Sequence, residues 1–141
     1  MRAEPWLIAG GFLSAVAALM HLAIIAGGPA WYRWFHAGEA IARMAERGEA
    51  QAWLVTLSIA AVLAVFAAYA FAAADVLPRL PLMRLALLGI TAIYLLRGLA
   101  LVPLLVWRPQ LVDSFILWSS FVVLVYGIVH AVGTWLVWPR L

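Results

Sequence analysis

The sequence contains no cysteine and no lysine, and it is poor in charge of either sign. Charged residues are 11% of its 141 residues, and its nine basic residues are all arginine. Without cysteine the chain has no disulfide, no thiolate nucleophile and no thiolate metal ligand. It also lacks a phosphate loop, a dinucleotide fingerprint and a serine-nucleophile motif. The formal net charge of +3 is spread over scattered arginines instead of a basic patch, so we predict no nucleic-acid partner.

Apolar residues, in contrast, are abundant and are gathered into long runs. Hydrophobic residues make up 68% of the chain, and its mean hydropathy is +1.08. Four runs reach the roughly 20 residues that cross a bilayer. In hydrocarbon each must be a helix, because only a helix satisfies its own backbone hydrogen bonds. We therefore predict an all-α membrane protein, one domain over residues 1–141, formed by a bundle of four transmembrane helices at approximately residues 6–26, 52–74, 83–106 and 112–135.

Arginine in place of lysine and abundant alanine are typical of GC-rich bacterial genomes, so the predicted location is a bacterial inner (plasma) membrane. The first apolar run is longer than the roughly 7–15 residues of a signal-peptide core, and we expect it to remain as a span. Outside the spans, four arginines fall on the side of the termini and four on the opposite side. This balance gives no orientation by the positive-inside rule and permits dual topology. The predicted partners are membrane lipids and, in a homo-oligomer, further copies of the same chain.

The connection between the first two apolar runs is too long for a simple turn and has a helical pattern of its own. Charged or polar residues recur in it at intervals of three or four, among them Arg33, His36, Glu39 and Arg43. Aromatic or small residues lie on the opposite face. The pattern predicts one amphipathic helix over residues 30–49, lying in the membrane interface as a float or as a lid over the bundle.

Arg97 lies near the middle of the third apolar run and is the best pointer to function in the sequence. An arginine at the centre of a span costs about 2.5–3.5 kcal/mol on insertion scales, so it needs a compensating partner. An ion pair with Asp113 or Glu39 is one explanation. The other is that an unpaired guanidinium binds an anionic group, such as a lipid phosphate or a small carboxylate. Gly98 and Pro103 predict a kink in the same helix.

Polar residues at helical spacing form one stripe on the third span and another on the fourth. Both stripes are expected to face the interior of the bundle, because lipid offers polar side chains no hydrogen-bonding partner. The stripes comprise Thr91, Tyr94 and Arg97 on the third span, and Ser119, Tyr126 and His130 on the fourth.

His21, in the first run, is a further polar group that we expect at membrane depth. With the rise of an α-helix, it lies roughly 7 Å from the bilayer midplane, on the side where Arg97 lies at roughly 4 Å. His130 falls on the other side, so about 16 Å separate the two histidines along the membrane normal. One haem iron cannot take both as ligands, and no carboxylate lies deep in a span to complete a metal centre. We therefore predict no cofactor and no metal.

Three functions remain open. The first is a small membrane protein that binds a small amphipathic or anionic, lipid-like ligand in one half of the bundle. The second is an accessory or oligomer-forming membrane subunit. The third is a membrane enzyme acting on a lipid-soluble substrate, with His21 as its one catalytic candidate, a proton-transfer group. The predicted ligand-binding residues are Arg97, His21, Tyr94, Trp118, Ser119 and Glu39.

Overall fold

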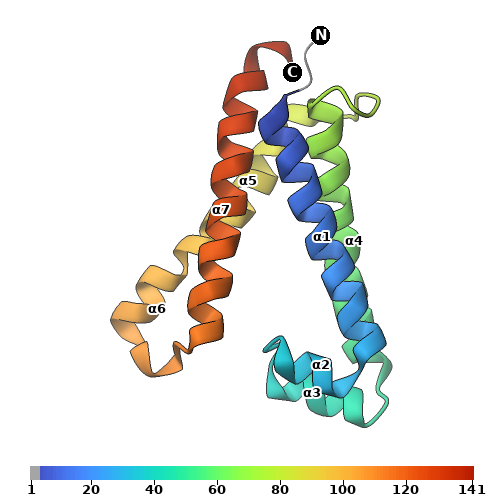
Figure 1. Ribbon diagram of the computed structural model, residues 1–141, viewed down its shortest axis with the longest axis vertical. Helices are drawn as coiled ribbons and strands as arrows, with labels where there is room; N and C mark the ends of the chain where they lie inside the picture. The colour runs from blue at the N-terminus through green and yellow to red at the C-terminus, as the bar shows by residue number, and fades with distance from the viewer. Residues whose placement is uncertain (1–3) are drawn as a thin grey trace. The chain divides into compact units, whose positions relative to one another are not determined.

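The computed structural model of the protein describes residues 4–141, and throughout this part of the chain the regular elements are helices. Arg2, counted above on the side of the termini, lies outside the described residues. The elements shown in Figure 1 are, in chain order, α1 (Pro5–Gly27), α2 (Pro29–Trp34), α3 (Glu39–Glu46), α4 (Ala50–Ala73), α5 (Met83–Leu99), α6 (Leu101–Trp107), the 3-10 turn η1 (Pro109–Leu111), α7 (Ser114–Val137) and the 3-10 turn η2 (Trp138–Arg140).

Four helical stretches are long and apolar enough to cross a membrane, which confirms the four long apolar helices expected from the sequence. Their length and composition indicate a multi-pass membrane protein. The stretches correspond to α1, α4, α5 continued by α6, and α7 continued by η2. Proline and glycine stand at several of their boundaries, since α1 begins at Pro5 and is followed by Gly28, whose φ is +69°.

The third span is interrupted, as Gly98 and Pro103 predict. It ends as α5 at Leu99 and resumes as α6 at Leu101. Pro103 has no N–H to donate to the carbonyl of Leu99, so the helical hydrogen-bond ladder is broken at this point. No α6 side chain is buried, and in Figure 1 α6 diverges from α7, whereas α5 runs along it. The interruption therefore leaves α5 as the packed half of the span.

The segment between α1 and α4 corrects the prediction of one amphipathic helix over residues 30–49. The structure has two shorter helices there, α2 and α3, which lie side by side as a hairpin (Figure 1). The chain leaves helical geometry between them, where His36 has a φ of +50° and Gly38 a φ of +98°. Glycine adopts the left-handed region without steric cost, so Gly38 provides the turn that the periodicity of polar residues conceals.

Contacts divide the chain into two compact units, and α1 and α4 each contribute to both. The first, called here the terminal unit, contains the chain up to Leu13 together with Phe66–Leu141. The second, the hairpin unit, is Ser14–Val65. A hydrophobic cluster lies in each: Leu7, Ala70, Ala72, Ala73, Ala74, Met83, Leu87 and Val137 in the terminal unit, and Ile24, Tyr32, Ala42 and Ala52 in the hairpin unit.

In the terminal unit, α5 and α7 approach closely at two glycines. A Cβ atom added to Gly98 would lie 2.8 Å from the Cα of Leu124, and one added to Gly127 would lie 2.7 Å from the Cδ2 of Leu95. Small residues allow this approach, which is how helices associate when no hydrophobic force separates them from lipid. The two contacts also show that α5 and α7 are antiparallel, and they define which residues of the two helices lie opposite each other.

Candidate functional site

Arg97 lies in the last turn of α5, and its hydrogen-bond partner comes from α7. Its Nη1 donates to the Oγ of Ser120 at 3.2 Å. The neighbouring Ser119 turns to its own helix and donates to the carbonyl of Ile116 at 3.3 Å. Ser120 is buried between the helices. The contact therefore involves the serine next to the predicted one, because the packing of α5 on α7 determines which of the two hydroxyls faces Arg97.

Within residues 4–141, no carboxylate forms an ion pair with Arg97. The two acids considered from the sequence make other contacts. The side chain of Asp113 accepts a hydrogen bond from the backbone N–H of Ile116 at 2.7 Å, and Glu39 pairs with arginines of the hairpin unit. Arg97 is exposed and has five N–H donors, of which Ser120 occupies one. The remaining donors can form two parallel hydrogen bonds with one anionic group.

Tyr94 packs among aromatic side chains of the terminal unit. It is 5% exposed, and its ring centroid lies 5.6 Å from that of Phe66, 5.5 Å from that of Tyr126 and 5.0 Å from that of His130. The two stripes thus meet at Tyr94, Tyr126 and His130. Arg97, also predicted to face the interior of the bundle, is exposed. Trp118, in contrast, is 69% exposed. It is two residues from Ser120, about 200° around the helix, so it does not lie with Arg97.

The other two predicted site residues belong to the hairpin unit. His21 is half-buried, and its Nδ1 lies 2.7 Å from the carbonyl oxygen of Ala17. A carbonyl only accepts, so Nδ1 is the donor in this hydrogen bond. Glu39 is the first residue of α3. Arg97, Tyr94, Trp118 and Ser119 therefore belong to one unit, and His21 and Glu39 belong to the other.

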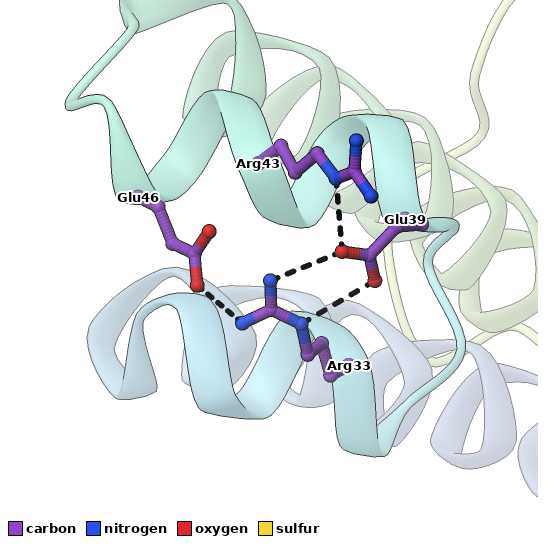
Figure 2. A network of polar contacts seen from close by, with 4 residues as sticks. All are labelled: Arg33, Glu39, Arg43 and Glu46. Atoms are coloured by element: carbon purple, nitrogen blue, oxygen red, sulfur yellow. Dashed lines mark hydrogen bonds and ion pairs between the residues drawn. The ribbon is translucent and has the colours of Figure 1, made fainter.

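The carboxylate of Glu39 is part of the network that fastens α2 to α3, drawn in Figure 2. Arg33 of α2 donates to both carboxylate oxygens of Glu39, at 3.3 and 3.1 Å, and also pairs with Glu46. Arg43 donates to Glu39 at 3.1 Å. The hydrogen bonds to Glu46 and Glu39, in that order, raise the pKa of Arg33, and the bond from Arg33 is the main cause that lowers the pKa of each glutamate.

The network predicts that the hairpin of α2 and α3 loses stability at acid pH only. Glu39 and Glu46 have pKa values below their ordinary value of 4.5, so their contribution to stability is complete above pH 4.5 and is lost as the pH falls through their lowered values. Both groups are exposed, so the contribution is small and salt-sensitive. In a ¹³C NMR titration of the side-chain carboxyls, Arg33→Gln should move both midpoints up towards 4.5.

Arg47→Gln is the matched control for this titration, because Arg47 pairs with Glu49 and with neither of the two glutamates. It should leave the midpoints of Glu39 and Glu46 unchanged. Equal midpoints in the wild type and Arg33→Gln would contradict the network.

A second polar cluster in the terminal unit was only partly visible in the sequence. His130 is fully buried, and its Nδ1 lies 2.8 Å from the carbonyl of Tyr126. Its Nε2, the Oγ1 of Thr91 and the Oγ1 of Thr134 are buried without a hydrogen-bond partner in the described part of the chain. Each such atom costs about 1–3 kcal/mol if it stays unpaired. The sequence could have indicated Thr134, because it lies one helical turn after His130 and so extends the polar stripe of α7.

The imidazole of His130 lies against the backbone of α1. A Cβ added to Gly10 would be 2.9 Å from the Cε1 of His130 and 3.1 Å from its Nε2, so only glycine leaves room for the ring. The hydroxyls of Thr56 and Ser58, in contrast, are satisfied within their own helix, since Thr56 donates to Ala52 at 2.9 Å and Ser58 to Leu54 at 2.8 Å. The missing bonds of the Thr91 and Thr134 hydroxyls are therefore a local feature of this cluster.

Among the residues that the structure describes, no three histidine, aspartate or glutamate side chains gather where they could hold a metal ion. No protein-family model, no curated protein and no solved structure matches the chain. A function for this chain is therefore inferred from the chemistry of its own residues.

Proposed function

We propose that this chain is a multi-pass protein of a bacterial inner membrane that binds the anionic group of a small amphipathic ligand at Arg97. The observation that carries the proposal is an exposed guanidinium on an apolar span, with a neutral hydroxyl as its hydrogen-bond partner and no paired carboxylate in the described chain. A charge held at membrane depth without an opposite charge is costly, and an anionic ligand offsets that cost.

The surroundings of Arg97 support an amphipathic ligand. Leu96 and Leu99, on either side of it in the last turn of α5, are exposed and apolar, as is Val102 after the helix break. An acyl chain or similar tail can pack on these side chains while the head group meets the guanidinium. Phosphate and carboxylate each present a pair of anionic oxygens that two parallel N–H groups of arginine can bind, so the proposal covers both.

The hairpin of α2 and α3 belongs to the same proposal as an element of the membrane interface. Trp31, Trp34 and Phe35 line, with Ala30, a cavity of about 440 Å³, and Trp34 is 72% exposed. The ring of Phe35 lies 4.6 Å from that of Trp34, edge to face. Tryptophans gather at the head-group level of membranes, which supports an interfacial position for this aromatic face.

The proposal is tested by mass spectrometry of the molecules that the protein retains in native membrane discs. We expect a phosphate- or carboxylate-bearing species in the wild type and at least a roughly tenfold lower amount in Arg97→Ala, because a charged hydrogen-bonded pair is lost. The adjacent serines give a matched comparison. Ser120→Ala removes the contact of Arg97 and should reduce retention, whereas Ser119→Ala should not.

Arg108→Ala serves as the control for charge, because it removes an exposed arginine outside the α5–α7 packing. It should retain the species at the wild-type level. The mass of the retained species distinguishes a phospholipid from a free carboxylate. Equal retention by the wild type and a folded Arg97→Ala variant would reject the proposal in favour of an accessory or oligomer-forming subunit.

A further inference from the structure

A groove of the terminal unit, formed by α5, α7 and η2, is mostly apolar and has a cation at one end. Its volume is about 380 Å³, within the range of small-molecule sites. Leu88, Trp135 and Trp138 of its lining are exposed, so the groove is open to the surroundings of the helices. The six residues that line it are all uncharged: Leu88, Thr91, Ala131, Thr134, Trp135 and Trp138.

The cation is Arg84, in the first turn of α5. It precedes Leu88 of the lining by one helical turn, which places both on the same side of α5. Its Cζ lies over the ring of Trp138, 5.3 Å from the ring centroid. The antiparallel register agrees with this contact, because three turns beyond the close approach of Leu95 and Gly127 the facing residues are Arg84 and Trp138. The guanidinium therefore lies at the η2 end of the groove.

The charge of Arg84 is not neutralised by a carboxylate of the described chain. The carboxylates of Glu4 and Asp75 both pair with Arg140, at 3.9 and 3.4 Å. The indole of Trp138 covers one face of the Arg84 guanidinium, and a guanidinium stacked in this way keeps the N–H donors at its edge for an anion.

The turn η2, which carries Trp138, is tied to the segment that leads into α5. The Nη2 of Arg79 donates to the carbonyl of Arg140 at 2.7 Å, and Arg140 itself pairs with Asp75. Both partners belong to the connection between α4 and α5. These contacts hold the indole beside the start of α5, so Arg84 has a defined surface on which to stack.

We propose that this groove binds an anionic phospholipid, with the phosphate of the head group at Arg84 and an acyl chain along the groove. Charge complementarity argues for this occupant, because an unpaired cation at one end of an uncharged, largely apolar groove fits a molecule with one anionic end and an apolar tail. Tryptophans gather at the head-group level of membranes, which suits Trp135 and Trp138 at this end. The site does not depend on Arg97, which lies thirteen residues further along α5, about 20 Å away.

Two photoreactive lipids that differ only in the head group test the inference: a phosphatidylglycerol and a phosphatidylcholine, each with a diazirine on the same carbon of one acyl chain. In phosphatidylcholine discs, the anionic lipid should label the segment 131–138 of the wild type about fivefold more than the zwitterionic lipid, the usual preference that one arginine at the head-group level confers. Arg84→Gln should bring this ratio towards one, and Arg84→Lys, which keeps the charge, should keep most of it.

Arg108→Gln is the matched control, because Arg108 is an exposed arginine just beyond the other end of the same span. It should leave the labelling ratio of the segment 131–138 unchanged.

The position of the diazirine gives a second measurement that uses the wild type alone. With the phosphate at Arg84, a diazirine near the ester should label close to Trp138, and one deeper in the chain should label closer to Ala131, because the groove extends between these two residues. Equal labelling by the two head groups, an unchanged ratio in Arg84→Gln, or a label that does not move with the diazirine would overturn the inference. The groove would then be a surface that bulk lipid covers without preference.

Discussion

Gly98→Ala is expected to lower the free energy of unfolding by about 1–3 kcal/mol, the usual effect of overpacking a close contact. The added methyl would lie 2.8 Å from the Cα of Leu124 and 2.9 Å from its backbone nitrogen. These are backbone atoms, so no side-chain rotation can relieve the contact, and α5 must move away from α7. The loss is measured by thermal unfolding in detergent, followed by intrinsic tryptophan fluorescence.

Gly89→Ala is the matched control, because Gly89 also lies in α5 and a methyl there would meet nothing within 4 Å. Alanine is the better helix former by about 0.8–1.0 kcal/mol, so this variant should be as stable as the wild type or more stable. If both variants lowered stability equally, the close approach of α5 to α7 at Gly98 would be contradicted.

The same substitution also bears on the proposed ligand. Gly98 adjoins Arg97, and separating α5 from α7 at this point lengthens the 3.2 Å contact between Arg97 and Ser120. We expect Gly98→Ala to retain less of the anionic ligand, although the guanidinium is still present. A variant that is destabilised but retains the ligand fully would show that Ser120 does not orient Arg97.

Tyr32→Ala is expected to detach the hairpin of α2 and α3 from the ends of α1 and α4. Tyr32 is buried in a cluster with Ile24, Ala42 and Ala52, one residue from each of the four helices. Removing a buried aromatic side chain typically costs about 3–5 kcal/mol, which exceeds what the exposed ion pairs of the hairpin contribute. Trypsin should then cleave after Arg43 much faster than in the wild type.

Two variants of the same helix separate the causes of this effect. Tyr32→Phe keeps the ring and loses a hydrogen bond of 3.3 Å to the carbonyl of Ala52, so it should behave nearly as the wild type does. Trp34→Ala removes a large but exposed side chain and should leave cleavage unchanged. A wild-type cleavage rate in Tyr32→Ala would mean that the hairpin is held by its ion pairs alone.

The four long helices followed from the sequence because lipid leaves a spanning chain little choice. A run of about 20 apolar residues must satisfy its backbone internally, and a helix is the form in which a single segment does so. The interruption of the third span could also be predicted from the sequence, because Pro103 lacks a backbone N–H donor in any surroundings. Both features are local consequences of residue type, and they do not depend on how the helices pack against one another.

The hairpin of α2 and α3 could not be predicted from the local sequence pattern alone. Polar residues at intervals of three or four between Arg33 and Glu46 suit one amphipathic helix and also suit two helices whose polar faces meet. The structure has the second arrangement, with Arg33 of α2 bonded to Glu39 of α3. Gly38 was the available signal, but the periodic pattern around it suggested an uninterrupted helix. What decided between the two was the burial of Tyr32 and Ala42 on the ends of α1 and α4.

Composition and apolar run length by themselves determined that this protein is helical and suited to a membrane, and they marked Arg97 as the costly residue. The tertiary structure decided that Ser120 and not Ser119 meets Arg97. This outcome depends on the register of α5 against α7, which the close contact at Gly98 sets. A one-residue change of register turns a helix face by about 100°, so no rule applied to one helix alone can decide which polar groups meet.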